Sequence, residues 1–423
     1  MTTTQPLTAP ASGRRRPRSA AVLAFSCRPH SGSEWGVGWN YLRLLASGFD
    51  HVSLYVRDAE DQVPRIRAEL ARMAIAHVSV VPITDTFFYP LFRKPAIHAR
   101  FLTAYYCLWL WKAFARLAAE RSWRRHDYLF HTTWVSDWIF SPLFLLPFGR
   151  KVLGPMSSQP ANFNERSSDR PASLLRLAVK TTLRWVSPNV LNALRADAAI
   201  GVSTRPMTVF PWVLCRRRRV ITPVHCEMQW SGPRQPQRQL LFIGKHLPFK
   251  NLDLFLAVAT ELLRRDDKLQ VCLLGDNLRQ AGTVDYMCQA GLDQHPRVRS
   301  EGLVGHQRVA EQLGGMRSVL LQASSEAGGT VGVEAISLGA PVVCVRGHGL
   351  DTLFDLELYP LAVPYRHHAQ FVADAADMVQ KVFADYDTHS HTVLALSQRF
   401  TLQASEDQLK ELINGIDASS GPR

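Results

Sequence analysis

Short apolar runs alternate along the chain with longer segments in which apolar residues return every three or four positions. In the first half, runs at Ala21–Ser26, His51–Val56 and His77–Pro82 predict buried strands. The segments between them, Ser33–Ser47 and Ala59–Met73, have helical periodicity. This alternation predicts an α/β fold with a parallel, doubly wound sheet, which binds its ligands at the carboxyl ends of the strands.

The same alternation starts again at Gln239, after a stretch rich in Pro, Gln and charged residues that predicts a linker. An apolar strand ending at Gly244 is followed by a helix at Leu252–Leu263 and a strand at Leu269–Gly275. The chain is therefore divided into a disordered basic tail at 1–19, a domain at 20–220, a linker at 221–238, a domain at 239–400 and a C-terminal helix and tail at 401–423.

The most informative stretch, residues 320–345, combines a buried strand, a glycine-rich bend and a helix start. Gly328 and Gly329 free the backbone to approach a ligand closely, and the helix N-terminus favours an anion. Glu326 and Glu334 flank the bend. Carboxylates would repel a phosphate, but they accept hydrogen bonds from hydroxyl groups, which a sugar nucleotide supplies in quantity.

Two cations and a histidine follow other predicted strands. Lys245 and Lys250 come directly after the strand that ends at Gly244, where they can hold a diphosphate. His131 ends the predicted strand Asp127–His131, although a lone histidine at a strand end is more often structural.

Charge is distributed unevenly over the 423 residues, whose formal net charge is +13. Residues 1–220 hold 31 Lys and Arg against 13 Asp and Glu, and residues 221–423 hold 18 against 23. The basic half suggests an anionic partner: an anionic membrane surface or an anionic glycan. Nucleic acid is not expected, because no binding module is recognised. Seven cysteines without metal-ligand spacing favour a reducing compartment and no zinc site.

Two further segments leave alternatives open. Ile97–Ala119 is apolar with interleaved Trp, Lys and Arg, which suits either an interfacial helix or a buried helix bordering the sheet. Asp385-Tyr-Asp387 has the form of a metal-binding Asp-x-Asp, but its place after a predicted helix favours a solvated helix end.

The residues around the bend resemble the donor-binding motif of retaining glycosyltransferases with the GT-B fold, specifically family four. The matching residues are Glu326, Gly329, Glu334-Ala335 and Gly339-Ala340-Pro341-Val342-Val343. The loop Gly32-Ser-Glu-Trp-Gly-Val-Gly-Trp39 and the pair Lys245 and Lys250 are similar to further segments of the family. Two positions depart from it: Ala327-Gly328 replaces Gly-Phe, and Lys245 replaces an arginine.

The resemblance implies two Rossmann-like domains facing across a cleft, with the last helix, from Leu402, crossing back to the first domain. It implies transfer of a sugar, with retention and without a metal or cofactor, from a nucleoside-diphosphate sugar to a glycan or lipid-linked acceptor. We expect a role in surface polysaccharide or glycoconjugate synthesis, in the cytoplasm or at the inner face of the membrane. The expected catalytic residues are His131, Lys245, Lys250 and Glu326, and the expected donor-binding residues are Gly32, Gly244, Gly328, Gly329, Thr330 and Glu334.

Two other functions fit the same sequence. A GT-B nucleotide-sugar epimerase would share the fold and the donor site, and a non-catalytic scaffold would use the basic first domain to bind glycan or membrane. A dinucleotide-dependent oxidoreductase fits less well, because no Gly-x-Gly-x-x-Gly follows the first strand.

Overall fold

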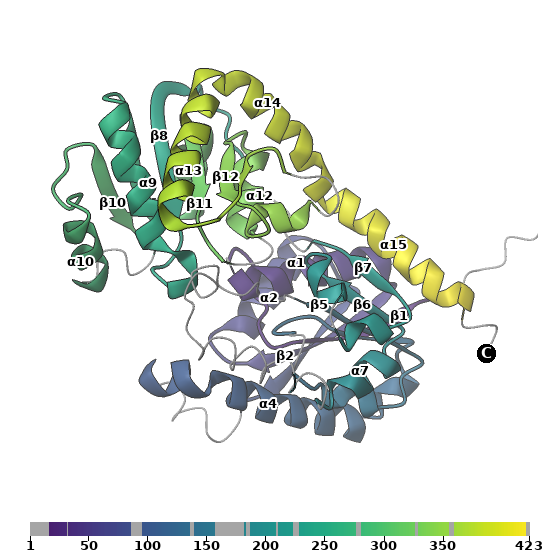
Figure 1. The fold of residues 1–423 in the computed structure, drawn as a ribbon. Helices are drawn as coiled ribbons and strands as arrows, with labels where there is room; N and C mark the ends of the chain where they lie inside the picture. The colour runs from purple at the N-terminus through teal and green to yellow at the C-terminus, as the bar shows by residue number, and fades with distance from the viewer. Residues whose placement is uncertain are drawn as a thin grey trace, which may run out of the picture.

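The first half of the chain folds around a parallel sheet with helices on both faces (Figure 1). The structure, a computed structural model, describes residues 17–31, 33–85, 95–135, 139–156, 182, 187–208, 210–222, 228–275, 281–325, 329–354 and 359–419. Within these ranges the N-terminal sheet has seven strands in the order β3-β2-β1-β4-β5-β6-β7, and every neighbouring pair is parallel. The strands are β1 (Ser19–Ala24), β2 (His51–Asp58), β3 (Val78–Thr84), β4 (Tyr128–His131), β5 (Arg150–Met156), β6 (Ala198–Gly201) and β7 (Arg218–Val220).

Side chains of β1 alternate between two hydrophobic cores, as expected for a strand covered on both faces. Val22 and Ala24 belong to the core under α1 and α2, whereas Leu23 and Phe25 belong to the core under α4. The helices of this domain are α1 (Ser33–Gly48), α2 (Gln62–Arg72), α4 (Pro95–Ala119), α7 (Asn189–Arg195) and α8 (Arg205–Thr208), with 3-10 turns η1 (Ser122–Arg124), η2 (Pro142–Leu145) and η3 (Trp212–Leu214).

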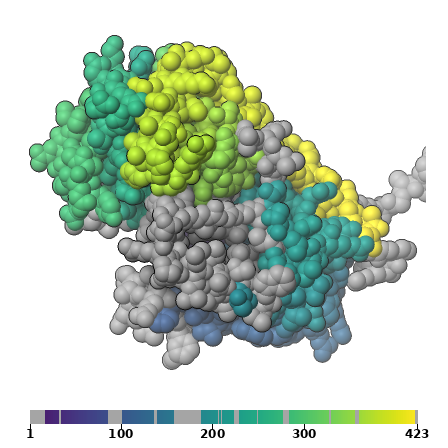
Figure 2. All heavy atoms as spheres, in the orientation of Figure 1, coloured from purple at the N-terminus to yellow at the C-terminus, as the bar shows by residue number. Residues whose placement is uncertain are grey.

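The second half forms a separate parallel sheet with helices on both faces (Figure 1), and in Figure 2 its green to yellow residues make up the upper part of the molecule. In the described residues its six strands have the order β10-β9-β8-β11-β12-β13. They are β8 (Gln235–Ile243), β9 (Gln270–Leu274), β10 (Val298–Gly302), β11 (Met316–Gln322), β12 (Val342–Val345) and β13 (Ala362–Val363). The helical elements are η4 (Pro248–Lys250), α9 (Leu252–Arg265), α10 (Ala281–Gln289), α11 (His306–Gly314), α12 (Thr330–Ser337), η5 (Leu350–Leu353), α13 (His368–Ala384), α14 (Tyr386–Ser397), η6 (Gln398–Phe400) and α15 (Leu402–Ser419).

The last helix, α15, returns to the N-terminal domain (Figure 1). Its residues Leu409, Ile413 and Ile416 are buried in the core that also contains α1. Near its end, Asp417 accepts a hydrogen bond from the Tyr128 hydroxyl and forms an ion pair with Arg150 at 2.9 Å. The C-terminal helix therefore ties the second domain to the first.

β7 ends at residue 220, like the predicted first domain, whereas β8 begins inside the segment 221–238 that was predicted as a linker. The run of arginines before residue 220 adds β7 to the edge of the first sheet, where it pairs with β6. β8 begins at Gln235, not at Gln239, because the Gln235 amide donates a hydrogen bond to the carbonyl of Gly315 (2.7 Å) beside β11. Both strands are polar where they start, so an apolar pattern does not reveal them.

The structure also describes the two segments for which the sequence left alternatives open, the apolar segment 97–119 and Asp385-Tyr-Asp387. α4 buries one face against the sheet, with Tyr106, Trp109 and Leu110 in the core, and leaves the other face exposed. Asp385 lies at the junction of α13 and α14, and Asp387 accepts a hydrogen bond from Arg317 (3.0 Å). None of the helices in the described ranges combines the length and hydropathy that a bilayer-spanning segment needs.

Candidate functional site

Each sheet has one place where the strand order reverses. In the N-terminal domain it lies between β1 and β4, and in the C-terminal domain between β8 and β11. Loops that leave neighbouring strands there run to opposite sides of the sheet, which leaves room for a ligand. His131 is the last residue of β4, and the other predicted site residues follow β1, β8 or β11 in the chain.

Lys250 lies at the reversal point of the C-terminal sheet. Its ammonium nitrogen is 3.8 Å from the point that a Cβ on Gly244 would occupy, so it lies over the end of β8. The neighbouring Asn251 is buried, and its amide donates hydrogen bonds to the Ala323 carbonyl (3.0 Å) and the Ser325 hydroxyl (3.1 Å). These bonds hold the Lys250 loop against the end of β11. Lys245, the other predicted cation, is exposed on the same loop.

A small hollow joins this loop to the start of α12. Its walls are formed by Phe242 and Ile243 of β8, the segment from Leu320 to Ser324, Lys250, and Val331 in the first turn of α12. A helix N-terminus carries unpaired N–H groups and a partial positive charge. The structure therefore brings a lysine and a helix N-terminus to the wall of one hollow, an arrangement suited to an anion.

Gly329, the residue before α12, lies in a tight space. It has φ +22°, and a Cβ there would lie 2.7 Å from the Leu350 amide nitrogen and 3.1 Å from the side-chain nitrogen of Gln322. The Gln322 side-chain oxygen in turn accepts a hydrogen bond from the Leu350 amide (2.8 Å). Gly329 thus allows the end of β11 and the start of η5 to approach the start of α12, while Thr330 begins the helix.

Glu334 lies one helical turn after Thr330, on the same face of α12. Its side chain is half-buried, and burial raises its pKa to about 7. Near neutral pH both the protonated and the charged form of Glu334 are therefore populated, and a hydrogen bond from a ligand hydroxyl would stabilise the charged form. The predicted residues Gly32, Glu326 and Gly328 lie outside the described residues, so their roles stay predictions.

Three glycines line up along the carboxyl edge of β8, β9 and β10. Gly244, Gly275 and Gly302 all have positive φ, at +154°, +152° and +73°. The Gly244 amide donates to the Leu274 carbonyl and the Gly275 amide to the Gly302 carbonyl, both at 2.8 Å. A Cβ on Gly275 would lie 2.0 Å from the Gly244 carbonyl oxygen, so a side chain there would displace the strand end that precedes Lys245.

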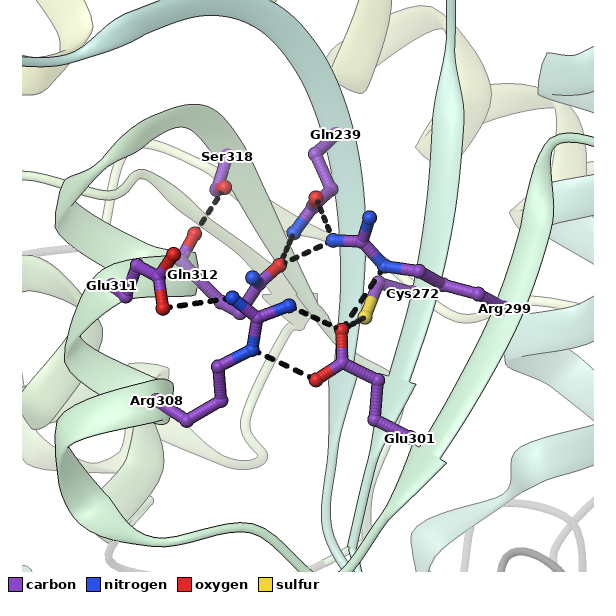
Figure 3. A network of polar contacts seen from close by, with 8 residues as sticks. All are labelled: Gln239, Cys272, Arg299, Glu301, Arg308, Glu311, Gln312 and Ser318. Atoms are coloured by element: carbon purple, nitrogen blue, oxygen red, sulfur yellow. Dashed lines mark hydrogen bonds and ion pairs between the residues drawn. The ribbon is translucent and has the colours of Figure 1, made fainter.

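A polar network below this edge was not predicted from the sequence (Figure 3). Arg299 donates to the side-chain oxygens of Gln239 (2.9 Å) and Gln312 (2.6 Å). Arg308 binds both oxygens of Glu301, at 2.7 and 2.9 Å, and this pairing lowers the pKa of the carboxyl. The network connects β8, β10 and α11, and it fixes the segment that leads into Gly302. Gln239 is 60 positions away from Arg299 in the sequence, and no motif connects the members of the network.

His131 lies at the end of β4, but its ring is buried. Nε2 lies 2.8 Å from the Tyr106 hydroxyl, which also donates to the Thr133 carbonyl (3.2 Å). Burial lowers the pKa of His131 to about 3, so the ring is neutral at physiological pH. Its catalytic role stays a prediction.

Glu34 is a candidate that the sequence did not single out. It lies in the first turn of α1, and its carboxylate accepts a hydrogen bond from the Trp134 amide (3.4 Å) in the loop after β4. Burial raises its pKa, which this hydrogen bond partly opposes. Trp134 also donates from its ring nitrogen to Ser26 (2.9 Å), so the loops after β1 and β4 are joined at the reversal point. Its place in the Gly-Ser-Glu-Trp segment was the available signal.

No group of three or more His, Cys, Asp and Glu side chains in the described part of the chain is placed to hold a metal ion. Independence from metal stays a prediction.

Two doubly wound domains, each with a reversal point that carries candidate ligand-binding groups, define the class of fold. Solved structures share it over nearly the whole chain. Anabaena HepE, in complex with UDP and glucose, aligns with a TM-score of 0.56 at 15% identity, covering 94% of this chain and 100% of that one. Sucrose-phosphate synthase from Thermosynechococcus elongatus aligns with a TM-score of 0.62 at 16% identity, covering 95% and 100%. A variant of S. aureus TarM, in complex with fondaparinux, α-GlcNAc-glycerol and UDP, aligns with a TM-score of 0.62 at 9% identity, covering 94% and 100%.

At such identities the likeness shows the fold alone, which is GT-B, as predicted. Residues 227–358 match the family model described as Glycosyl transferases group 1. A curated relative, the D-inositol 3-phosphate glycosyltransferase of Frankia alni, is 32% identical over 146 residues, which are 33% of this chain and 35% of the relative. The match thus spans about a third of that relative. The chain therefore has the GT-B fold that the resemblance implied, and residues 227–358 are similar to glycosyl transferases group 1.

Proposed function

We propose that the protein is a retaining glycosyltransferase that moves a sugar from a nucleoside-diphosphate sugar to a glycan or lipid-linked acceptor. The observation that carries the proposal is the common wall formed by Lys250 and the first turn of α12 at the β8/β11 reversal point. This is where a doubly wound domain binds its ligand, and both groups attract a diphosphate. The group 1 match over residues 227–358 covers the same elements.

UDP-sugars are the first donors to test. Anabaena HepE and S. aureus TarM are both described in complex with UDP, and both align with nearly the whole of this chain. We propose that UDP lies along the carboxyl edge of β8, β9 and β10, with its diphosphate toward Lys250. Gly244 and Gly275 are partly exposed at this edge, and neither carries a side chain that would cover the backbone.

Breaking the bond between sugar and diphosphate leaves extra negative charge on the departing phosphate. Lys245, Lys250 and the N–H groups at Gly329 and Thr330 would stabilise that charge. These fixed groups would serve without a divalent cation, so transfer should survive chelation by EDTA. Retention of the anomeric configuration would follow from attack on the same face that the diphosphate leaves.

Two carboxylates would accept hydrogen bonds from the hydroxyl groups of the donor. Glu334 on α12 would accept hydrogen bonds from the ribose, and Glu326 would orient the transferred sugar. The half-buried position of Glu334 and its raised pKa favour this role, because a carboxylate removed from water gains from each hydroxyl donor. The reaction would supply surface polysaccharide or glycoconjugate synthesis.

A panel of nucleotide sugars tests the proposal. One UDP-sugar should raise the melting temperature of the protein and be hydrolysed slowly, and the released sugar should keep its anomeric configuration when followed by NMR. Binding of no nucleoside diphosphate would overturn the proposal. Conversion of the donor to its epimer in the absence of an acceptor would replace it with the epimerase alternative.

A further inference from the structure

The exposed large apolar side chains of the N-terminal domain gather on neighbouring elements. Among the described residues of this domain, every such side chain lies on α4, η2, α7 or η3. They include Phe101, Leu108 and Trp111 of α4, Leu145 of η2, and Leu191 and Leu194 of α7, and they are 38% to 62% exposed. α4 contacts η2, and α7 contacts both η2 and η3, so the four elements form a continuous surface. We call this surface the apolar face.

The apolar face is not explained by the fold. α4 packs on the sheet through Tyr106, Trp109 and Leu110, which satisfies the hydrophobic stripe that a surface helix needs. Phe101, Leu108 and Trp111 are spaced by seven and three residues and form a second stripe on the outer side. A helix face that is exposed to solvent ordinarily carries polar residues, and a cluster of exposed apolar side chains marks an interaction site.

Charge near the apolar face indicates the kind of partner. The residues of α4 (95–119) include three Lys and Arg and no Asp or Glu. Arg121, Arg124 and Arg125 follow α4 and are exposed, and exposed arginines also end α7 (Arg195) and follow η3 (Arg216). A second copy of the chain would bring equal charges together, because a twofold dimer pairs the same surface of each subunit. An anionic lipid surface instead complements both the apolar and the positive groups.

We propose that the apolar face docks the protein on an anionic membrane, with the outer stripe of α4 inserted at the level of the lipid headgroups. Tryptophan and leucine suit that depth, and the arginines beside them meet the lipid phosphates. Figure 1 shows α4 and α7 along the edge of the N-terminal domain that is remote from the C-terminal domain. Docking there leaves the nucleotide-sugar site of the C-terminal domain away from the membrane, so the surface and the proposed activity are separable.

Vesicle flotation tests this proposal. The full chain is mixed with vesicles of phosphatidylcholine alone or of phosphatidylcholine with phosphatidylglycerol, and the floated fraction is measured. Two variants remove the two kinds of group: Leu108→Ser with Trp111→Ser, and Arg121→Ser with Arg124→Ser and Arg125→Ser. The matched controls are Val284→Ser and Lys268→Ser, at exposed positions of the C-terminal domain. Circular dichroism and UDP-dependent thermal stabilisation verify that each variant is folded.

We expect flotation only with the anionic vesicles and its loss at high salt. Removing the two apolar side chains should weaken binding by more than about tenfold. Removing the three arginines should weaken it by about a hundredfold, since each basic group near an anionic surface contributes about a factor of five. The controls should bind as the wild type does.

Three results would overturn the proposal. The first is that the wild type fails to float with anionic vesicles. The second is that the apolar and the arginine variants both float like the wild type. The third is that light scattering without lipid shows a dimer that Leu108→Ser with Trp111→Ser abolishes, which would make the apolar face an interface between two copies. Each result is independent of sugar transfer, which is measured separately on a soluble donor.

Discussion

Replacing Lys250 with methionine removes one positive charge from the donor site and keeps a side chain of similar length. Lys250 is half-buried and lines a hollow whose other walls include Phe242, Leu320 and Val331, so water screens it less than a lysine on an open loop. At about 4 Å and an effective dielectric constant of about 20, a charge pair is worth about 4 kcal/mol. The hollow is partly open, which reduces this to about 2–3 kcal/mol, or about 30- to 150-fold in kcat/KM.

Calorimetry with UDP and steady-state transfer or hydrolysis of the donor both measure the effect. Lys250→Met should weaken UDP binding and lower kcat/KM together, because the diphosphate carries its charge both in the bound product and in the transition state. The matched control is Lys268→Met, at an exposed lysine in the turn that precedes β9, at the opposite edge of the same sheet. Equal UDP affinity and turnover in Lys250→Met, Lys268→Met and the wild type would refute the reasoning.

Three further predictions concern the same domain. The pKa of Glu334 is about 7 in the folded protein and 4.5 ordinarily, so the unfolded chain loses this proton at lower pH, and the free energy of unfolding should fall as pH rises between these values. Glu334→Gln should remove this pH dependence of the free energy of unfolding, measured by urea titration at several pH values. An unchanged pH dependence would contradict the assignment. Gln312→Ala should lower the free energy of unfolding by about 1–3 kcal/mol, because it breaks a buried network, whereas Glu311→Ala at the exposed rim should cost less than about 0.5 kcal/mol. Gly275→Ala should reduce UDP affinity by displacing the neighbouring strand end, while Gly305→Ala, where a Cβ meets nothing within 4 Å, should bind UDP normally; the reverse order would exclude a nucleotide at this edge.

Apolar periodicity predicted most of the fold, because both sheets are parallel and buried on two faces. Strands such as Leu269–Gly275 and helices such as Leu252–Leu263 agree with β9 and α9 to within two residues at each end. Strands at the edges of the sheets were harder to predict from the sequence. β7 consists of Arg218, Arg219 and Val220 and is stabilised by pairing with β6, which leaves no apolar pattern.

The candidate site was predictable where its residues are close in sequence, and not where it depends on contacts between distant segments. Lys250 and Gly244 are six positions apart, and the turn after β8 brings them together. The environment of His131, by contrast, depends on α4, whose Tyr106 hydroxyl lies 2.8 Å from Nε2, and burial keeps the ring neutral. The contact between Glu34 and Trp134 joins residues 100 positions apart, and only the folded sheet brings them together.

A crystal structure of the protein with UDP tests the central claim most directly. The account predicts that the diphosphate lies within about 3.2 Å of the Lys250 ammonium and of the first N–H groups of α12, with the uridine along the carboxyl edge of β8, β9 and β10. A nucleotide bound at another place on the chain, with Lys250 and α12 making no contact to it, would contradict the account.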